Sequence, residues 1–194
     1  MHSSSATNQS QADSPDASSS PANASPANAS GAETMPSAVQ ILPEAAQTLQ
    51  GDNFSALLLD RWQSLEQATF NLITRNFKVQ GKLFLKELLG LTGAEISLNV
   101  MPPGGAVPFY HKHQQSEEIY LFIQGQGEFQ VDGECFAVQA GSVVRVAPDG
   151  ERCWRNTGAD MLVAIVVQVL QKSYESIHTI VDGVAIDKPV VWTD

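Results

Sequence analysis

The sequence predicts an all-β fold made of antiparallel strands, and two observations support this prediction. From residue 94 onward, polar and apolar residues alternate with a period of two, first in AEISLNVM, as expected for a strand with one buried face. Similar short runs then recur at close spacing, and turn-forming residues rather than helical patterns separate them. Many short strands without helices between them indicate an antiparallel sandwich or barrel.

The strands are placed by the turns between them. The clearest prediction is the hairpin FQVDGECF, because Asp132-Gly133 between two alternating runs is typical of a tight turn with positive φ. The run MLVAIVV is apolar and rich in β-branched residues, which predicts a buried strand. The C-terminal TIVDGVAIDKPVVW is a candidate edge strand, in which Pro189 limits pairing. The expected strands cover residues 94–101, 106–111, 117–124, 126–131, 134–139, 142–147, 151–156 and 161–170.

Three regions are expected along the chain. Residues 1–35 are low in complexity and rich in Ser, Ala, Pro and Asn, so they bury too little apolar surface to offset the entropy of ordering, and a disordered tail is predicted. Residues 36–93 are expected to form an extension that packs on the barrel, and residues 94–194 to form the barrel with a C-terminal strand segment. Within the extension, we expect a short helix in 36–50, a helical first half of 55–77, an extended segment at 69–77, and a helical turn or a strand in 81–93.

The charge of the chain excludes several classes of partner. The 194 residues carry a net charge of −10, and a basic face for nucleic acid or for an anionic membrane is therefore not expected. The N-terminus lacks a secretory signal and no apolar run is long enough for a membrane helix, so a soluble, cytoplasmic protein is predicted. The spacing of Cys135 and Cys153 fits no zinc motif, and both are expected to be free thiols.

One stretch, HKHQQSEEIYLF, carries a candidate site. On a strand, residues two apart share a face, so His111 and His113 point the same way. By the same rule Glu118, Tyr120 and Phe122 share one face of the next strand. Two imidazoles and one carboxylate from adjacent strands form a facial set of three ligands that suits Fe, Mn, Ni or Zn and leaves coordination positions open. The competing interpretation is an exposed polar hairpin.

The glycines around this stretch distinguish the two interpretations. The order Gly105, five residues, His111, one residue, His113, four residues, Glu118, six residues, Gly125 closely resembles the first motif of the cupin superfamily, in its small conserved-barrel form. The resemblance implies a double-stranded β-helix, or jelly-roll barrel. It also implies that Glu118 rather than Glu117 is the ligand, since only Glu118 has the six-residue gap to the second glycine.

The second motif of that family is present in altered form. The stretch GSVVRVAPDGERCWRN runs from Gly141 to Asn156 with the family's separation, but Ala147 and Asp149 stand where a proline and a glycine belong. Arg152 stands where the family has a histidine that usually ligates the metal. Arginine stays protonated and has no lone pair to offer, so it cannot replace that ligand.

Three arrangements around Arg152 remain open. In the first, the two histidines and Glu118 hold a metal, and Arg152 binds an anionic ligand beside it. In the second, Arg152 pairs with Glu118 and replaces the metal. In the third, Arg152 points outward and another residue, such as Gln114 or His178, completes the site. A divalent metal beside a guanidinium requires an anion between them.

The expected function follows from this constellation. Strand parity places Arg152 and Trp154 on one face, so both are expected to line the ligand pocket with Tyr120 and Phe122. We expect a small cupin that binds a divalent metal (Fe, Mn, Ni or Zn), a small anionic ligand, or both. The alternatives are a metal-dependent enzyme of the dioxygenase, decarboxylase or isomerase type, with Glu117 or Tyr120 as acid–base groups, and a metal-free cupin with an Arg152–Glu118 pair. Edge strands and the long extension favour a homodimer.

Overall fold

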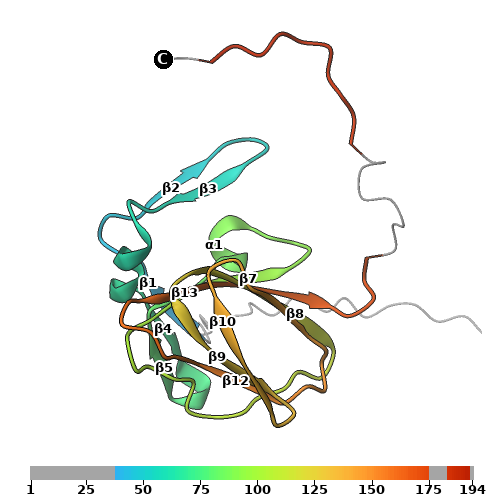
Figure 1. The fold of residues 1–194 in the computed structure, drawn as a ribbon. Helices are drawn as coiled ribbons and strands as arrows, with labels where there is room; N and C mark the ends of the chain where they lie inside the picture. Colours follow the sequence, from blue (N-terminus) through green and yellow to red (C-terminus); the bar gives the residue numbers. More distant parts are fainter. Residues whose placement is uncertain (1–37, 175–182, 193–194) are drawn as a thin grey trace, which may run out of the picture. The chain divides into compact units, whose positions relative to one another are not determined.

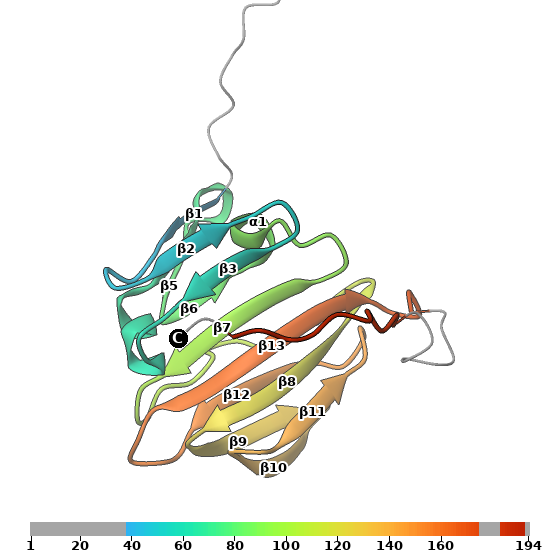
Figure 2. The same ribbon diagram turned by 90° about the horizontal axis from the view of Figure 1, so that it is seen from above.

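The computed structural model describes residues 38–174 and 183–192, and its central feature is a barrel of two antiparallel sheets. A five-stranded sheet has the order β11-β8-β13-β7-β6, and a three-stranded sheet has the order β10-β9-β12 (Figures 1 and 2). The bounds are β6 Lys82–Phe84, β7 Glu95–Met101, β8 Ser116–Gln124, β9 Gln126–Val131, β10 Glu134–Gln139, β11 Val143–Val146, β12 Arg152–Asn156 and β13 Leu162–Leu170.

Seven of the expected strands are confirmed and one is not. The β9–β10 hairpin turns at Asp132 and Gly133, whose φ angles of 51° and 87° are the positive values predicted for this turn. The expected strand at 106–111 was wrong, because this segment makes only two isolated bridges, Ala106 with Arg155 and His111 with Arg152. Pro108 lies between these bridges and has no N–H group to continue a ladder.

The extension differs most from the prediction. Strands β1 and β2 replace the helix expected in 36–50, and β3 replaces the start of the next expected helix, which is reduced to the short helix η1. The segment expected to be extended at 69–77 is confirmed only at its start, as β4, because the short helix η2 follows it and β5 begins at Phe77. Residues 81–93 contain both the strand β6 and the helical turn α1. The bounds are β1 Ala38–Ile41, β2 Gln47–Gln50, β3 Ser55–Leu58, η1 Trp62–Gln67, β4 Thr69–Leu72, η2 Ile73–Arg75, β5 Phe77–Gln80 and α1 Lys86–Leu89.

Long-range contacts explain why β1 forms where a helix was expected. The side chain of Gln40 on β1 bonds the backbone of Phe84 twice, accepting from its N–H at 2.6 Å and donating to its carbonyl at 2.9 Å. Strand β1 also pairs with β4, and β4 with β5, in a separate three-stranded sheet. The partners of β1 are distant in the sequence, so a local pattern does not reveal them. In contrast, β2 pairs with β3 and β4 with β5 as neighbours along the chain.

Two hydrophobic clusters hold the barrel sheets and the extension together. The first fills the barrel between its two sheets and includes Tyr120, Phe129 and Trp154. The second joins β7 and β13 to the extension, and it includes Leu65 of η1, Leu83 of β6 and Leu98 of β7. Strand β6 thus has two roles, because it belongs to the barrel sheet and it contributes to the cluster under the extension.

Some predictions concern segments outside the described residues. These are the tail 1–35, His178 and the first part of the candidate C-terminal strand. The described part of that strand, 183–192, contains no strand. Among the residues that the structure describes, no helix is long and apolar enough to cross a membrane. Cys135 and Cys153 are free thiols, as predicted.

Candidate metal site

The structure brings together the three predicted ligands, His111, His113 and Glu118. The backbone of His111 exchanges two hydrogen bonds with Arg152 on β12, at 3.2 and 3.0 Å, and the N–H of His113 donates to the carbonyl of Pro148 at 3.0 Å. These contacts fix the short segment before β8, while Glu118 projects from β8 into the barrel. One potential ligand atom from each side chain lies within 4.8 Å of the other two.

The two oxygens of Glu118 have different partners. Oε2 accepts hydrogen bonds from the Tyr120 hydroxyl at 2.5 Å and from Nε and Nη2 of Arg152 at 3.1 and 2.7 Å. Oε1 faces Nε2 of His113 at 3.2 Å. Burial alone would raise the pKa of Glu118, but the hydrogen bonds from His111, Tyr120 and Arg152 outweigh it and hold the pKa well below its usual range. The carboxylate is therefore ionised, and Oε1 remains free to bind a cation.

The histidines have the unsatisfied nitrogens that a metal site requires. Nδ1 of His111 and Nε2 of His113 are buried without a hydrogen-bond partner, although Nε2 lies close to Glu118. Burial is the largest influence on His113 and lowers its pKa, which keeps the ring neutral with a lone pair to donate. An unpartnered buried nitrogen is unfavourable, and a metal ion beside Glu118 would satisfy Nε2 of His113. In His111 the nitrogen that faces Glu118 is Nε2, at 3.7 Å from Oε2. Two imidazoles and a carboxylate are donors that fit Fe, Mn, Ni or Zn.

Arg152 lies behind Glu118. Its side chain is 0 % exposed, so the arrangement in which it points outward was wrong. Besides its two bonds to Glu118, Nη1 donates to the carbonyl of Gly150 at 2.8 Å and lies 3.4 Å from that of Pro148. The guanidinium is therefore engaged by acceptors of the protein, and it orients Glu118 instead of facing the cavity.

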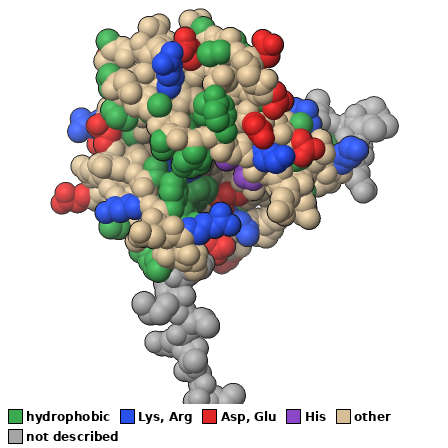
Figure 3. Space-filling view, turned by 90° about the horizontal axis from the view of Figure 1, so that it is seen from below, with side chains coloured by type: hydrophobic (Ala, Val, Ile, Leu, Met, Phe, Trp, Pro, Cys, Tyr) green, Lys and Arg blue, Asp and Glu red, His purple; other side chains and the backbone are tan. Residues whose placement is uncertain are grey.

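A cavity of about 480 Å³ adjoins the three candidate ligands. Tyr120 and Trp154 line it, as their strand parity predicts, whereas Phe122 packs against Phe129 and Trp154 in the core. Figure 3 shows histidine side chains (purple) beside a hollow that hydrophobic and basic side chains border. These are His111 and His113, because the other two histidines of the chain lie outside the described residues.

Comparison with known proteins identifies the fold. The model of the Cupin domain family matches residues 97–168. A cupin protein of Bacteroides fragilis is 42% identical, with a TM-score of 0.50, over 54% of this chain and 88% of that protein. The chain belongs to the cupin superfamily. The expected double-stranded β-helix is thereby confirmed.

Two further relatives of this cupin are more distant. A predicted oxalate decarboxylase of Thermotoga maritima is 28% identical, with a TM-score of 0.43, over 49% of this chain and 83% of that protein. An uncharacterized protein of Methanocaldococcus jannaschii is 36% identical over 56 residues, which are 29% of this chain and 45% of that protein. This cupin thus matches less than half the length of that curated relative.

The two suggested acid–base groups of the cupin have other partners. Glu117 faces the opposite side of β8 from Glu118 and accepts a hydrogen bond from Nε of Arg145 at 2.7 Å. Burial, followed by the charge of Glu118, raises the pKa of Tyr120, so its hydroxyl stays protonated and donates to Glu118. Glu117 thus links β8 to Arg145 of β11, and Tyr120 helps to hold the carboxylate of Glu118 in place.

Sequence reasoning missed the contribution of the extension to the cavity. Phe77 and Lys78 of β5 and Lys82 and Phe84 of β6 line it. The alternation in KLFLK gave one local signal, because it places Lys82 and Phe84 on the same face of a strand. That this face turns into the barrel depends on the pairing of β6 with β7, which no local pattern reveals.

Proposed function

We propose that this cupin holds one divalent transition metal at His111, His113 and Glu118 and binds a small anionic molecule in the adjoining cavity. The observation that carries the proposal is the convergence of three ligand atoms within 4.8 Å at the wall of the cavity. The unpartnered Nε2 of His113, which faces Glu118, supports it further.

The charges of the site favour an anionic ligand. Glu118 and Arg152 form a pair with no net charge, and a neutral histidine adds none. A divalent ion would therefore bring a positive charge that the three ligands alone do not balance, which an anion in the cavity would offset. Glu118 itself supplies the negative charge that must lie between the metal and the guanidinium, with Oε2 bonded to Arg152 and Oε1 facing His113.

Three protein ligands would leave coordination positions open on a metal that can act as a Lewis acid. The candidate ligands lie at the cavity, so a substrate there could reach such a position. This supports, as a second candidate, a metal-dependent enzyme of the dioxygenase, decarboxylase or isomerase type.

The metal-free alternative rests on a different observation. Arg152 is fully buried and makes two hydrogen bonds to Glu118, which is the ion pair that could replace a metal. The two alternatives differ in the role of the histidines. A metal site needs both rings, whereas the ion pair forms without them.

Metal analysis of the purified full-length chain, prepared without a metal-binding tag, tests the proposal. We expect about one equivalent of Fe, Mn, Ni or Zn per chain, most of it lost in His111→Ala. Lys112→Ala is the matched control, because this exposed residue lies between the two histidines and its removal should leave the metal content unchanged. A folded wild-type chain without metal would overturn the proposal and favour the ion pair. In that case Arg152→His should create metal affinity, since it restores the family's third histidine.

A further inference from the structure

Lys82 is a basic residue that the extension places in the wall of the cavity. It lies on β6 opposite Asn99 of β7, and both residues line the cavity. Its Nζ lies 4.7 Å from the centre of the Phe84 ring, so the aromatic face covers one side of the ammonium. The side chain is half-buried.

The ammonium of Lys82 lacks a full ionic partner. Within 38–174 and 183–192, Lys82 forms no ion pair within 4.0 Å, and its Nζ donates no hydrogen bond to a side chain or carbonyl. Burial is the dominant influence and lowers its pKa, while the more distant charges of Glu118 and Glu95 act in the opposite direction. A half-buried ammonium without a carboxylate at contact distance has lost part of its hydration and gained no ion pair in return, which is unfavourable.

The surroundings of Lys82 favour a ligand over a structural role. Its contact with Phe84 is a weak stabilising interaction, and an apolar side chain of similar length could pack there equally well. Ser97 and Asn99 of β7 also line this part of the cavity, so its wall is polar as well as basic. Glu95 of β7 also lines the cavity, and it accepts a hydrogen bond from the backbone N–H of Lys86 at the start of α1, at 3.0 Å.

We propose that Lys82 binds an anionic group, a carboxylate or a phosphate, of the molecule held in the cavity. The ligand class is then a small acid with two polar ends, one at Lys82 and one at the three candidate ligands. Only the second of these ends depends on the metal of the proposed function. The extension thereby becomes part of the binding site, since β6 carries the residue that selects the charge of the ligand.

Calorimetric titration of the full-length chain with succinate, malonate and inorganic phosphate tests this inference, and acetate serves as the comparison with one charged group. We expect at least one of the three dianionic probes to bind more tightly than acetate. Lys82→Met should weaken its affinity about 10- to 100-fold, as expected for loss of a charge-assisted hydrogen bond, and Lys82→Arg should retain most of it. Binding by phosphate alone would identify the anionic group as a phosphate, and binding by the dicarboxylates alone as a carboxylate.

Lys78→Met is the matched control, because Lys78 also lines the cavity but is exposed on β5. Equal losses of affinity in Lys78→Met and Lys82→Met would overturn the proposal, because removing any positive charge near the cavity would then have the same effect. Unchanged affinity in Lys82→Met, or no binding of any probe to the wild type, would overturn it as well.

Metal content measured on the same samples separates this inference from the proposed function. Lys82→Met should contain as much metal as the wild type, because Lys82 is not among the three candidate ligands. A metal-free wild type whose anion binding still depends on Lys82 would refute the metal site and leave this inference intact. A metal-loaded wild type with unchanged affinity in Lys82→Met would do the reverse.

Discussion

At the scale of single residues, Arg152 is the position that changes this cupin most. The family pattern has a histidine there, and the arginine instead donates to Oε2 of Glu118 and to the carbonyl of Gly150. A buried ion pair contributes little net stability, because desolvation opposes the attraction between the charges. Removing one partner is nevertheless costly, since the other charge stays buried alone. We therefore interpret Arg152 as the residue that holds Glu118 ionised and oriented.

Arg152→Ala should consequently destabilise the fold strongly. We expect a loss of about 3–5 kcal/mol in the free energy of unfolding of the metal-free chain, measured by urea denaturation, because Glu118 would remain buried without a cation. Arg145→Ala is the control, as it breaks the neighbouring pair with Glu117 on the exposed side of β8 and should cost at most about 1 kcal/mol. Similar losses in the two variants would contradict the assigned role of Arg152.

At the scale of elements, the sequence predicts the barrel well and the extension poorly. The strands from β7 to β13 each carry an alternating pattern between clear turns, and the family's glycine spacing correctly brought His111, His113 and Glu118 together. In the extension, β1 was missed because it pairs with the distant β4, whereas β2 and β3 form a local hairpin whose sequence carries no clear strand pattern. The burial of Arg152 behind Glu118 follows from strand parity, but its bonds to backbone carbonyls depend on the turn after β11. The role of Lys82 in the cavity was missed for the same reason as the pairing of β6.

Gly125, which ends the first motif, joins β8 to β9 and shows why that motif needs a glycine. Its φ is +81°, and a Cβ atom there would lie 2.4 Å from the backbone carbonyl oxygen of Met161. Gly133 in the next hairpin also has a positive φ, of +87°, but a Cβ atom would meet nothing within 4 Å. Both positions therefore require a positive φ, and only Gly125 also has a backbone atom where a Cβ would lie.

Alanine at these two glycines separates strain from crowding. Gly133→Ala should cost about 1–2 kcal/mol in unfolding free energy, from the left-handed conformation alone. Gly125→Ala should lose a further 1–3 kcal/mol or so, because the backbone of Met161 must shift to accommodate the methyl group. Urea denaturation curves of the two variants, measured side by side, check this difference. Equal losses of unfolding free energy would show that the backbone of Met161 shifts away from the methyl group at little cost.

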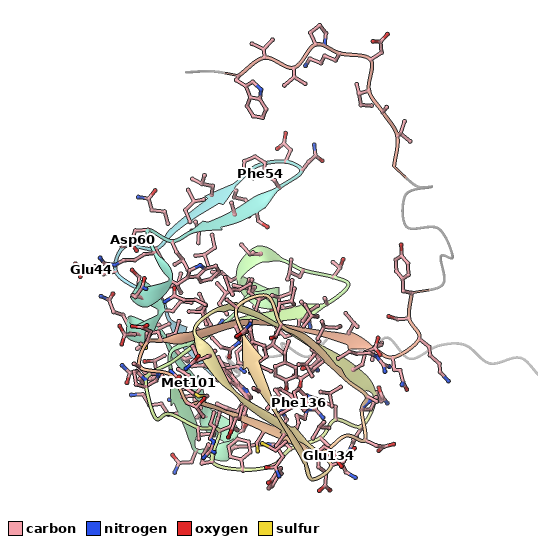
Figure 4. The ribbon with its side chains drawn as sticks, in the orientation of Figure 1. Glu44, Phe54, Asp60, Met101, Glu134 and Phe136 are labelled. Atoms are coloured by element: carbon pink, nitrogen blue, oxygen red, sulfur yellow. The ribbon has the colours of Figure 1, made fainter. Side chains whose placement is uncertain are left out.

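At the scale of the whole molecule, the exposed apolar residues of the β2–β3 hairpin are a candidate contact surface for a second copy. The two strands pair only with each other, and a two-stranded sheet is marginally stable by itself. Leu49, Phe54 and Leu58 of this hairpin are 47 %, 59 % and 47 % exposed. Figure 4 shows Phe54 in the turn of the hairpin, and Phe136 on β10 of the barrel. We propose that this hairpin contributes to a homodimer, in which a second copy covers its apolar side chains.

Light scattering coupled to size-exclusion chromatography tests the dimer. The wild-type chain should have about twice the monomer mass of 20.9 kDa, and Phe54→Asp should move it to the monomer mass, because a carboxylate would be buried in the interface. Phe136→Asp is the matched control at another exposed aromatic residue, which stacks on Phe129 within the chain, and it should leave the dimer intact. If Phe136→Asp alone produces monomers, the barrel sheet β10-β9-β12 rather than the hairpin forms the interface. A monomeric wild type would contradict the dimer itself. The apolar side chains of the hairpin would then be exposed to water rather than covered by a second copy.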